Sequence, residues 1–336
     1  LYKDSIYRPL IDKSLLSMFP PGSPFKILVG LTALQEEIIT EKSTIYCKGY
    51  YIYGKEKRKI NCHCGGGYRN IYNAISLSCN SYFADTYRKT INSQNNTKEN
   101  FDNWSNHIKS FGLGNYLNND LPIGKKGVIP DSEYYDRWYP DFKWGATTTI
   151  SNSIGQGEIL TTPIQLANMT AAVANEGYYY IPHIIKKIDG DTIDVRFKTP
   201  IKTSIDGTHF KTMNKALYRV FKSGTGKLLN VPGIEICGKS GTVENFTKIN
   251  GIKTQLSDHS IFIAYAPKEN PTIAISVLVE NAGYGSVWAG RIASLMIEKY
   301  INDNISLKKM EKIVLNKNLE KEYLKPYLSK SFNINE

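Results

Sequence analysis

The clearest hydrophobic pattern in the chain lies in the stretch PPGSPFKILVGLTALQEEII, residues 20–39. Its opening PPG interrupts any preceding regular structure. From Phe25 onward, apolar residues recur at helical spacing, which predicts a buried helix. Ser23 is expected at the N-cap of this helix, and Pro24 at its first position, where the missing N–H costs nothing.

The same spacing recurs later in the chain and predicts further helices. One of them is expected to begin after Thr162 as the cap, with Pro163 at its first position and Gly177 at its end. A charged helix followed by a loose end is expected in the tail. The other predicted helices cover residues 71–90, 101–111, 210–221 and 286–301.

From Tyr178 onward the period changes to two, which is typical of strands. β-Branched and aromatic residues are common in the predicted strands, which cover residues 178–188, 234–244, 257–266 and 272–279. A two-stranded excursion is expected within residues 46–80, and a long ordered loop over 121–145. Helices come first and a mainly antiparallel sheet comes last. This order predicts an α+β fold, with a sheet flanked by helices and an α-rich lobe.

Composition limits the class of protein. At 336 residues and 41% hydrophobic content, the chain can bury a substantial core. Its net charge of +11 is compatible with an anionic partner. The basic residues are dispersed, apart from the run KEKRK at 55–59 and the tail. We therefore expect no nucleic-acid partner. A cell-wall glycan or a lipid surface is compatible with such a diffuse positive charge. We find no signal peptide and no apolar run near the ~20 residues that a membrane span needs.

Candidate chemistry begins at Ser23 and Lys26, which lie three residues apart and therefore on one side of a helical turn. A serine hydroxyl becomes a nucleophile when a base takes its proton, and a lysine with a lowered pKa can be that base. The positive end of the helix also favours the negative charge that develops there. The alternative is a plain cap beside a solvated lysine, and the same SxxK spacing recurs at Ser306 and Lys309.

Two further patterns follow later in the chain. Ser78 and Asn80 form an SxN pair in an apolar helical context, where a hydroxyl and an amide can bridge the lysine and hold a substrate. Lys239 begins the sequence KSGT within a predicted strand, where a glycine permits close approach of a ligand. The same letters recur at 222–225, where we expect only a turn after a helix.

SxxK, SxN and KSG in this order are the signature of penicillin-binding proteins and serine β-lactamases. Residues 7–300 resemble the transpeptidase domain of class B penicillin-binding proteins, most closely the elongation type. The segments that carry the resemblance are PPGSPFK, SCNSYF, SIGQGEILTTPIQLANMTAAVANEG, GKSGTVEN, DHSIFIAYAP and ENAGYGS. Pro24 and Ser240 differ from the threonine that is more common in the family.

The resemblance implies a role for each motif residue. Ser23 would attack the terminal D-Ala-D-Ala of a stem peptide, Lys26 would be the general base, kept neutral beside Lys239, and Ser78 would relay the proton. Backbone N–H groups of Ser23 and Thr242 would form the oxyanion hole. The substrate-binding residues would be Asn80, Lys239, Ser240, Gly241 and Thr242.

The resemblance also implies partners and a location. We expect a peptidoglycan D,D-transpeptidase that serves cell-wall elongation, reacts with β-lactams and needs no cofactor for catalysis. Its partners would be stem peptides and a SEDS-type glycan polymerase, with the catalytic domain in the periplasm at the inner membrane. The domain would cover 1–302, including an α-rich lobe and active-site loops over 91–175. The charged tail would cover 303–336, and an anchor and pedestal would lie upstream.

Other functions remain open at this stage. A D,D-carboxypeptidase or a β-lactamase of the same fold would release the acyl group with water. A non-catalytic β-lactam sensor or cell-wall scaffold would keep the pocket and need no acceptor. A third alternative is a zinc-ribbon interaction module attached to an inactive domain.

Four of the five cysteines fall in one short window: Cys47, Cys62, Cys64 and Cys79. Four thiolates, or three with His63, suit tetrahedral Zn²⁺, and some elongation-type proteins resemble this arrangement with mixed ligands. We expect a structural zinc that fixes the SxN motif. A disulfide from Cys47 to Cys62 or Cys64, or free thiols, are the alternatives. Cys237 is expected to be a small buried strand residue.

Overall fold

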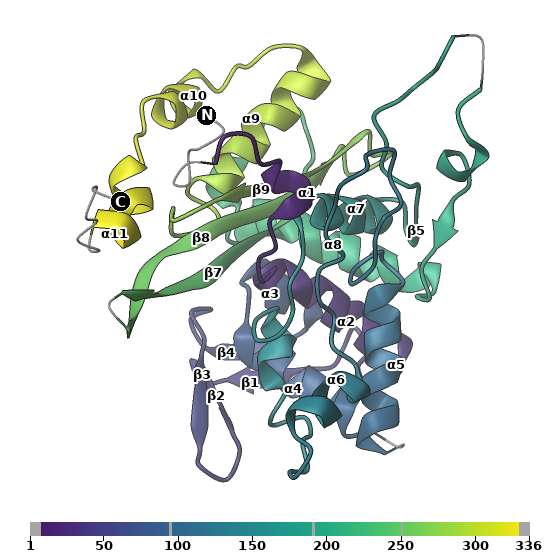
Figure 1. Cartoon of the computed structure of the whole chain (residues 1–336), viewed down its shortest axis with the longest axis vertical. Helices are drawn as coiled ribbons and strands as arrows, with labels where there is room; N and C mark the ends of the chain where they lie inside the picture. The colour runs from purple at the N-terminus through teal and green to yellow at the C-terminus, as the bar shows by residue number, and fades with distance from the viewer. Residues whose placement is uncertain (1–7, 94–95, 190–191, 250, 329–336) are drawn as a thin grey trace, which may run out of the picture.

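The computed structural model describes residues 8–93, 96–189, 192–249 and 251–328. An antiparallel sheet and a helical lobe lie one above the other (Figure 1). The sheet has the order β7–β8–β9, formed by β7 (Cys237–Ile249), β8 (Ile252–Ala266) and β9 (Ile273–Val279). The antiparallel sheet and the helical lobe agree with the predicted α+β class.

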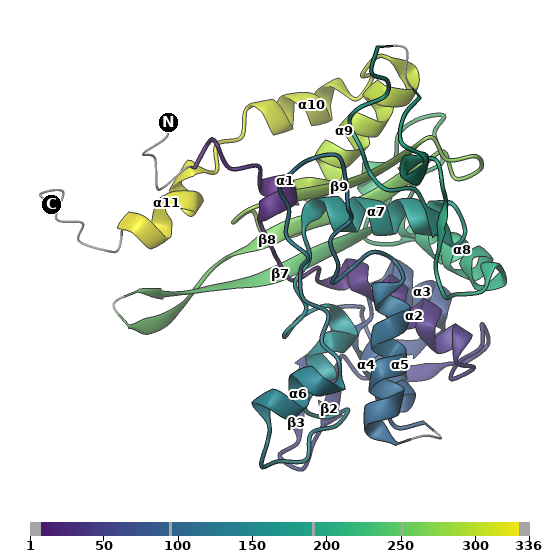
Figure 2. The ribbon, with the colours of Figure 1, turned by 45° about the vertical axis from the view of Figure 1, so that its right-hand side comes forward.

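Helices cover both sides of this sheet. In Figures 1 and 2, α9 (Ala289–Asn302) lies on one side, and α7 (Pro163–Ala174) and α8 (Gly207–Ser223) lie on the other. Helix α7 begins as predicted, because the Thr162 side chain and Gln165 form a capping box ahead of Pro163. Figure 2 also shows the paired ends of β7 and β8 extending beyond the rest of the sheet.

The lobe is built around α2 (Lys26–Gln35), a helix whose residues from Lys26 to Leu34 are all buried. Helices α3 (Ile71–Ser76), α4 (Asn80–Ile91) and α5 (Thr97–Lys109) pack on α2, and α6 (Ser132–Trp138) packs on α5. Phe101 is completely buried at the centre of an aromatic cluster. Its ring centroid lies 5.2–5.3 Å from those of Trp104, Tyr135 and Trp144.

The start of α2 differs from the prediction in one respect. Ser23 is not an N-cap; it is the first residue of a 3₁₀ turn, η1 (Ser23–Phe25), whose cap is Gly22. Gly22 has φ +61, and its carbonyl accepts a hydrogen bond from the Phe25 N–H. Since backbone groups make the turn, the Ser23 side chain makes no capping bond and is free for other partners.

The predicted helix over 71–90 is broken in two. Helix α3 ends at Ser76 and α4 begins at Asn80, and Ser78 between them has φ +56. A left-handed conformation is costly for a residue with a Cβ, and it turns the chain sharply. Ser78 and Asn80 therefore lie at a helix break and not along a helix face.

The excursion is more elaborate than one hairpin. It contains β1 (Ile45–Cys47) paired with β4 (Gly67–Arg69), and β2 (Tyr50–Tyr53) paired with β3 (Arg58–Asn61). The predicted strand over 178–188 is wrong beyond its start, because only β5 (Tyr178–Tyr179) forms, paired with β6 (Ile201–Lys202). The loop predicted over 121–145 contains helix α6.

The tail forms two helices, where one was predicted. These two helices and the remaining short elements complete the described structure. These elements are α1 (Lys13–Leu16), η2 (Ile150–Ile154), η3 (Val195–Phe197), η4 (Lys227–Leu229), α10 (Lys308–Leu315) and α11 (Glu320–Leu328). None of the described helices combines the length and apolar character needed to cross a bilayer.

The aromatic cluster makes the lobe sensitive to truncation. Phe101→Ala should lower the free energy of unfolding by about 3–5 kcal/mol, because a buried phenyl ring is replaced by a cavity. Urea titration followed by circular dichroism measures the change. Phe142→Ala is the matched control, since the Phe142 side chain is 74% exposed and its loss should change stability by less than about 0.5 kcal/mol. Equal effects of the two substitutions would contradict the assigned core.

Candidate active site

Three elements meet at a cleft between the lobe and the sheet: the start of α2, the break between α3 and α4, and strand β7. The cleft has a volume of about 450 Å³. The SxxK, SxN and KSG residues, far apart in sequence, are thus brought together at one place. The residues that line it are Ser23, His63, Leu77, Ser78, Asn80, Ile154, Gln156, Thr225, Ser240, Thr242, Glu244, Asp258, Tyr284, Gly285 and Ser286.

Ser78 is the centre of the hydrogen-bond network. Its Oγ donates to Ser23 Oγ at 2.9 Å and accepts from both Lys26 Nζ at 3.1 Å and Lys239 Nζ at 2.9 Å. Lys26 Nζ also donates to the Ser78 carbonyl at 2.9 Å and to Asn80 Oδ1. The Asn80 amide nitrogen donates to the Asn61 carbonyl, which fixes the orientation of the amide group.

Strand β7 lies close to the start of α2 because of a glycine. A Cβ at Gly241 would lie 2.6 Å from Pro24 Cδ, which is too close for any side chain. Ser240 Oγ lies 2.8 Å from Thr225 Oγ1, and Thr242 Oγ1 accepts from the Gly285 N–H at 3.3 Å. The two β7 hydroxyls therefore line the same cleft as Ser23.

Both lysines are fully buried, which is unusual for this residue type. Burial lowers the pKa of Lys26 to about 8. Burial and the nearby charge of Lys26 lower the pKa of Lys239 well below its ordinary value. Two ammonium groups around one hydroxyl repel each other, so protonation of one amine disfavours protonation of the other. The site therefore contains an amine that can accept a proton.

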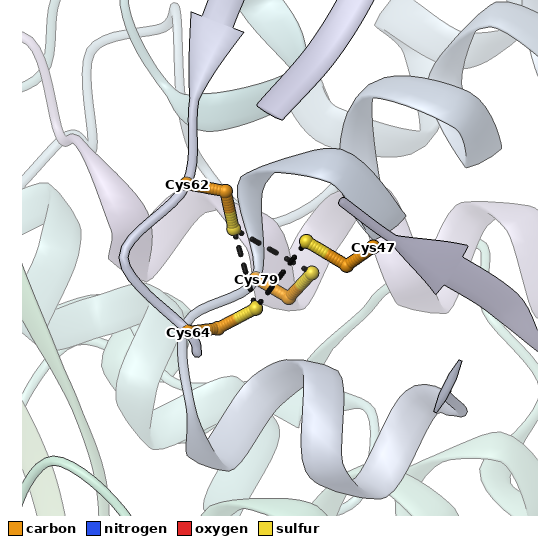
Figure 3. Close-up of side chains that lie close together, drawn as sticks. All are labelled: Cys47, Cys62, Cys64 and Cys79. Carbon is orange, nitrogen blue, oxygen red and sulfur yellow. Dashed lines mark hydrogen bonds between the residues drawn. The ribbon is translucent and has the colours of Figure 1, made fainter. Parts of the chain in front are cut away.

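A second cluster lies directly behind the α3–α4 break. The Sγ atoms of Cys47, Cys62, Cys64 and Cys79 are buried and all lie within 4.8 Å of one another (Figure 3). Cys62 Sγ lies 3.3 Å from Cys64 Sγ and 3.7 Å from Cys79 Sγ, and Cys64 Sγ lies 3.6 Å from Cys47 Sγ. All four cysteines are free thiols in this structure.

Two sulfur atoms of this cluster accept hydrogen bonds from backbone N–H groups. The Asn80 N–H donates to Cys62 Sγ at 3.2 Å, and the Gly49 N–H to Cys47 Sγ at 3.4 Å. A hydrogen bond from the Cys79 thiol is the main reason that the pKa of Cys62 lies far below its ordinary value. His63, the alternative ligand in the sequence analysis, is not brought into the cluster: it is exposed and lines the catalytic cleft.

Several cleft residues were missed in the sequence. Thr225 belongs to the second KSGT sequence, which does form the expected turn after α8 but also places its hydroxyl against Ser240. Gln156, Glu244, Asp258 and Tyr284 line the cleft as well. All four lie in segments that carried the resemblance, namely SIGQGE, GKSGTVEN, DHSIFIAYAP and ENAGYGS, which is the only signal that points to them.

Known proteins similar to this chain were found at three levels. The family model described as the penicillin binding protein transpeptidase domain matches residues 2–298. Peptidoglycan D,D-transpeptidase MrdA of Acinetobacter baumannii is 31% identical over 295 residues, which cover 84% of this chain and 42% of that protein. The protein of the same name from Haemophilus influenzae is 30% identical over 318 residues, covering 90% and 47%. The chain thus spans less than half the length of these relatives.

Solved structures show the same likeness. PBP2 of Pseudomonas aeruginosa, in complex with WCK 5153, aligns with a TM-score of 0.76 at 30% identity, covering 89% of this chain and 64% of that one. PBP2 of Helicobacter pylori, in complex with MreC, aligns with a TM-score of 0.72 at 26% identity, covering 88% and 52%.

Proposed function

Because this chain belongs to the penicillin-binding protein transpeptidase family, we propose that it cross-links peptidoglycan as a serine D,D-transpeptidase. The family match confirms the resemblance found in the motifs. The observation that carries the proposal is the chain of contacts from Ser23 Oγ through Ser78 Oγ to two buried lysine amines. Such a chain can remove a proton from the serine and return it to a leaving amine.

The donor stem peptide binds with its terminal carboxylate beside Lys239, Ser240 and Thr242. A carboxylate at this position favours the ammonium form of Lys239, because opposite charges stabilise each other. Repulsion between the two amines then favours the neutral form of Lys26. Substrate binding thereby frees Lys26 as the base. Asn80 binds the amide of the residue before the scissile bond.

In the first step, Ser23 Oγ forms a bond to the carbonyl carbon of the penultimate D-Ala. The Ser23 proton passes through Ser78 to Lys26, and then to the nitrogen of the terminal D-Ala as its C–N bond breaks. Backbone N–H groups of Ser23 and Thr242 stabilise the oxyanion, a contribution of roughly 3–4 kcal/mol per donor in comparable sites. In the second step, the amine of another stem peptide attacks the acyl carbon and Ser23 is released.

If water released the acyl group from Ser23, the protein would be a carboxypeptidase or a β-lactamase. A sensor or a scaffold would not turn over stem peptides. The names of the curated relatives favour transpeptidation. We place the domain on the periplasmic side of the inner membrane, where its substrate lies. The Helicobacter pylori relative was solved with MreC, and we propose a similar elongation assembly here, with a SEDS-type glycan polymerase.

The cysteine cluster is proposed to hold a structural zinc ion. Sulfur ligands around tetrahedral zinc lie roughly 3.8 Å apart, given a zinc–sulfur distance near 2.3 Å. The contacts of 3.3–3.7 Å in this cluster are close to that value. Cys79 is the N-cap residue of α4, directly between Ser78 and Asn80. A zinc ion bound there would fix the helix break that presents both residues to the cleft.

The nucleophile can be tested with benzylpenicillin and intact-mass spectrometry. The native chain should gain the mass of one penicillin. Ser23→Ala should gain none, because this substitution removes the hydroxyl that is linked to the lysine pair by Ser78 Oγ. Ser306→Ala, which alters the second SxxK sequence, is the control and should still form the adduct. An adduct that persists for hours argues against a β-lactamase. A folded native chain without an adduct would overturn the serine mechanism.

The base can be tested through the pH dependence of acylation. Below the lowered pKa, the Lys26 amine is protonated and cannot accept the serine proton. The second-order rate constant for benzylpenicillin should therefore rise nearly tenfold from pH 6 to pH 7 and level off above about pH 8. This apparent pKa belongs to the lysine pair. Lys26→Arg, which stays protonated, should lose at least 10²-fold in rate at every pH. A flat native profile would contradict the assignment.

Zinc can be tested by elemental analysis of protein purified without chelators. The native chain should hold one zinc per molecule, and Cys62→Ser should hold much less and acylate more slowly. Cys237→Ser is the matched control, because this fifth cysteine is buried in β7, outside the cluster, and its loss should leave the zinc content unchanged. Absence of metal together with fewer than five titratable thiols would support a disulfide instead.

A further inference from the structure

A second groove adjoins the catalytic cleft on the side where the donor carboxylate is proposed to bind. It has a volume of about 420 Å³ and lies between the turn after α8, the start of α9 and α10. Thr225 and Ser286 line both cavities, so the groove and the cleft are neighbours. Helix α10 packs beside α9 in Figures 1 and 2 and contributes Met310 and Ile313 to the lining.

The lining of this groove combines exposed apolar side chains with two cations. Leu228, in the turn after α8, is 90% exposed, and Ile313 is 47% exposed. Large apolar side chains that are exposed together in a concave surface are typical of a binding site. The two cations of the lining are Lys227 and Arg291.

Neither cation has an acidic partner in the described part of the chain. No ion pair within 4.0 Å joins Lys227 or Arg291 to a carboxylate there, whereas Lys308 of the adjoining α10 is paired with Glu311. The Arg291 guanidinium lies over the Trp288 ring, 5.5 Å from its centroid, a contact that leaves its N–H groups available to a carboxylate. The groove therefore suits a ligand that is partly apolar and carries negative charge.

The chemistry of the second step indicates which peptide lies in this groove. Attack of an amine on the acyl-enzyme is the reverse of acyl-enzyme formation, so by microscopic reversibility the incoming nitrogen takes the place of the leaving D-Ala nitrogen. The leaving D-Ala is proposed to have its carboxylate at Ser240 and Thr242, and Ser240 Oγ lies 2.8 Å from Thr225 Oγ1. An acceptor that approaches Ser23 from this direction therefore extends past Thr225 into the groove.

We infer that the groove binds the acceptor stem peptide, and that Lys227 and Arg291 pair with its carboxylates. This inference rests on the proposed transpeptidase function. An acceptor stem peptide with an amine on an alkyl side chain and a free carboxyl terminus matches both the apolar and the cationic parts of the lining. Its nitrogen bonds to the acyl carbon as the ester bond to Ser23 Oγ breaks. The proton that the amine loses returns to Ser23 Oγ through Ser78.

The test compares two acceptors that differ only in the charge of their C-terminus: Nα-acetyl-Lys-D-Ala-D-Ala and its C-terminal amide. The donor is Nα,Nε-diacetyl-Lys-D-Ala-D-Ala, which has no free amine and cannot act as an acceptor. Mass spectrometry measures the ratio of cross-linked product to hydrolysed donor in separate reactions with each acceptor. Because both products come from one acyl-enzyme, this ratio does not depend on the rate of acylation or on the fraction of folded protein.

The native chain should give a ratio at least fivefold higher with the free acid than with the amide. Lys227→Gln and Arg291→Gln should each reduce this preference, and the double variant should bring it to about one. Lys227→Arg, which keeps the charge, should retain it. Lys55→Gln is the control for loss of a positive charge, since Lys55 is exposed in the turn between β2 and β3, outside the groove, and it should keep the native preference.

Cross-linking without a preference in the native chain, or with a preference unchanged in the double variant, would overturn the inference and leave the transpeptidase function supported. The second of these results would place the acceptor carboxylate elsewhere in the cleft. A native chain that releases D-Ala but forms no cross-linked product with either acceptor would overturn the transpeptidase function, and the inference with it, in favour of a carboxypeptidase.

Discussion

The active site depends on one costly arrangement: two lysine amines buried around a single serine hydroxyl. Removing a charged amine from water is unfavourable, and placing a second one nearby is more so. The site tolerates this because Ser78 Oγ accepts from both, and because the Ser78 carbonyl and Asn80 Oδ1 provide further acceptors for Lys26. Burial lowers the pKa of Lys26, and burial together with the charge of Lys26 lowers the pKa of Lys239, so the arrangement that costs stability also provides a base.

Holding Ser78 at this position requires an unusual backbone. A left-handed conformation at φ +56 costs about 1–2 kcal/mol for a serine, and it interrupts the helix, so that α3 ends before Ser78 and α4 begins after it. The buried cysteines behind the break offer a reason why the chain keeps this conformation. Cys79 is the N-cap residue of α4, Cys62 accepts a hydrogen bond from the Asn80 N–H, and the cluster joins this point to the excursion. Loss of the cluster would thus affect catalysis through geometry and not through contact with substrate.

Much of the fold and most of the site residues could be predicted from the sequence, because hydrophobic periods, capping residues and motifs agreed with the final structure. The apolar period placed α2, and Thr162 with Pro163 placed the start of α7. The break at Ser78 could not be predicted, since its residues are compatible with a helix and tertiary contacts override that preference. Ser23 was expected to be a cap because serine is common there; in the structure the close approach of Gly22 to Thr242 and Val243 sets the turn instead. Thr225 lies in a turn after α8, and no local pattern reveals that this turn packs against Ser240.

The distribution of charge along the cleft gives the site a direction. The lysine pair and the hydroxyls of Ser240 and Thr242 form an end suited to a carboxylate. The donor proposed above, a peptide with a free carboxyl terminus, would place its carboxylate at this end and its penultimate carbonyl at Ser23. In the proposed mechanism the position of the carboxylate thereby selects the bond to be cleaved, while Ser78 and Lys26 carry out the proton transfers.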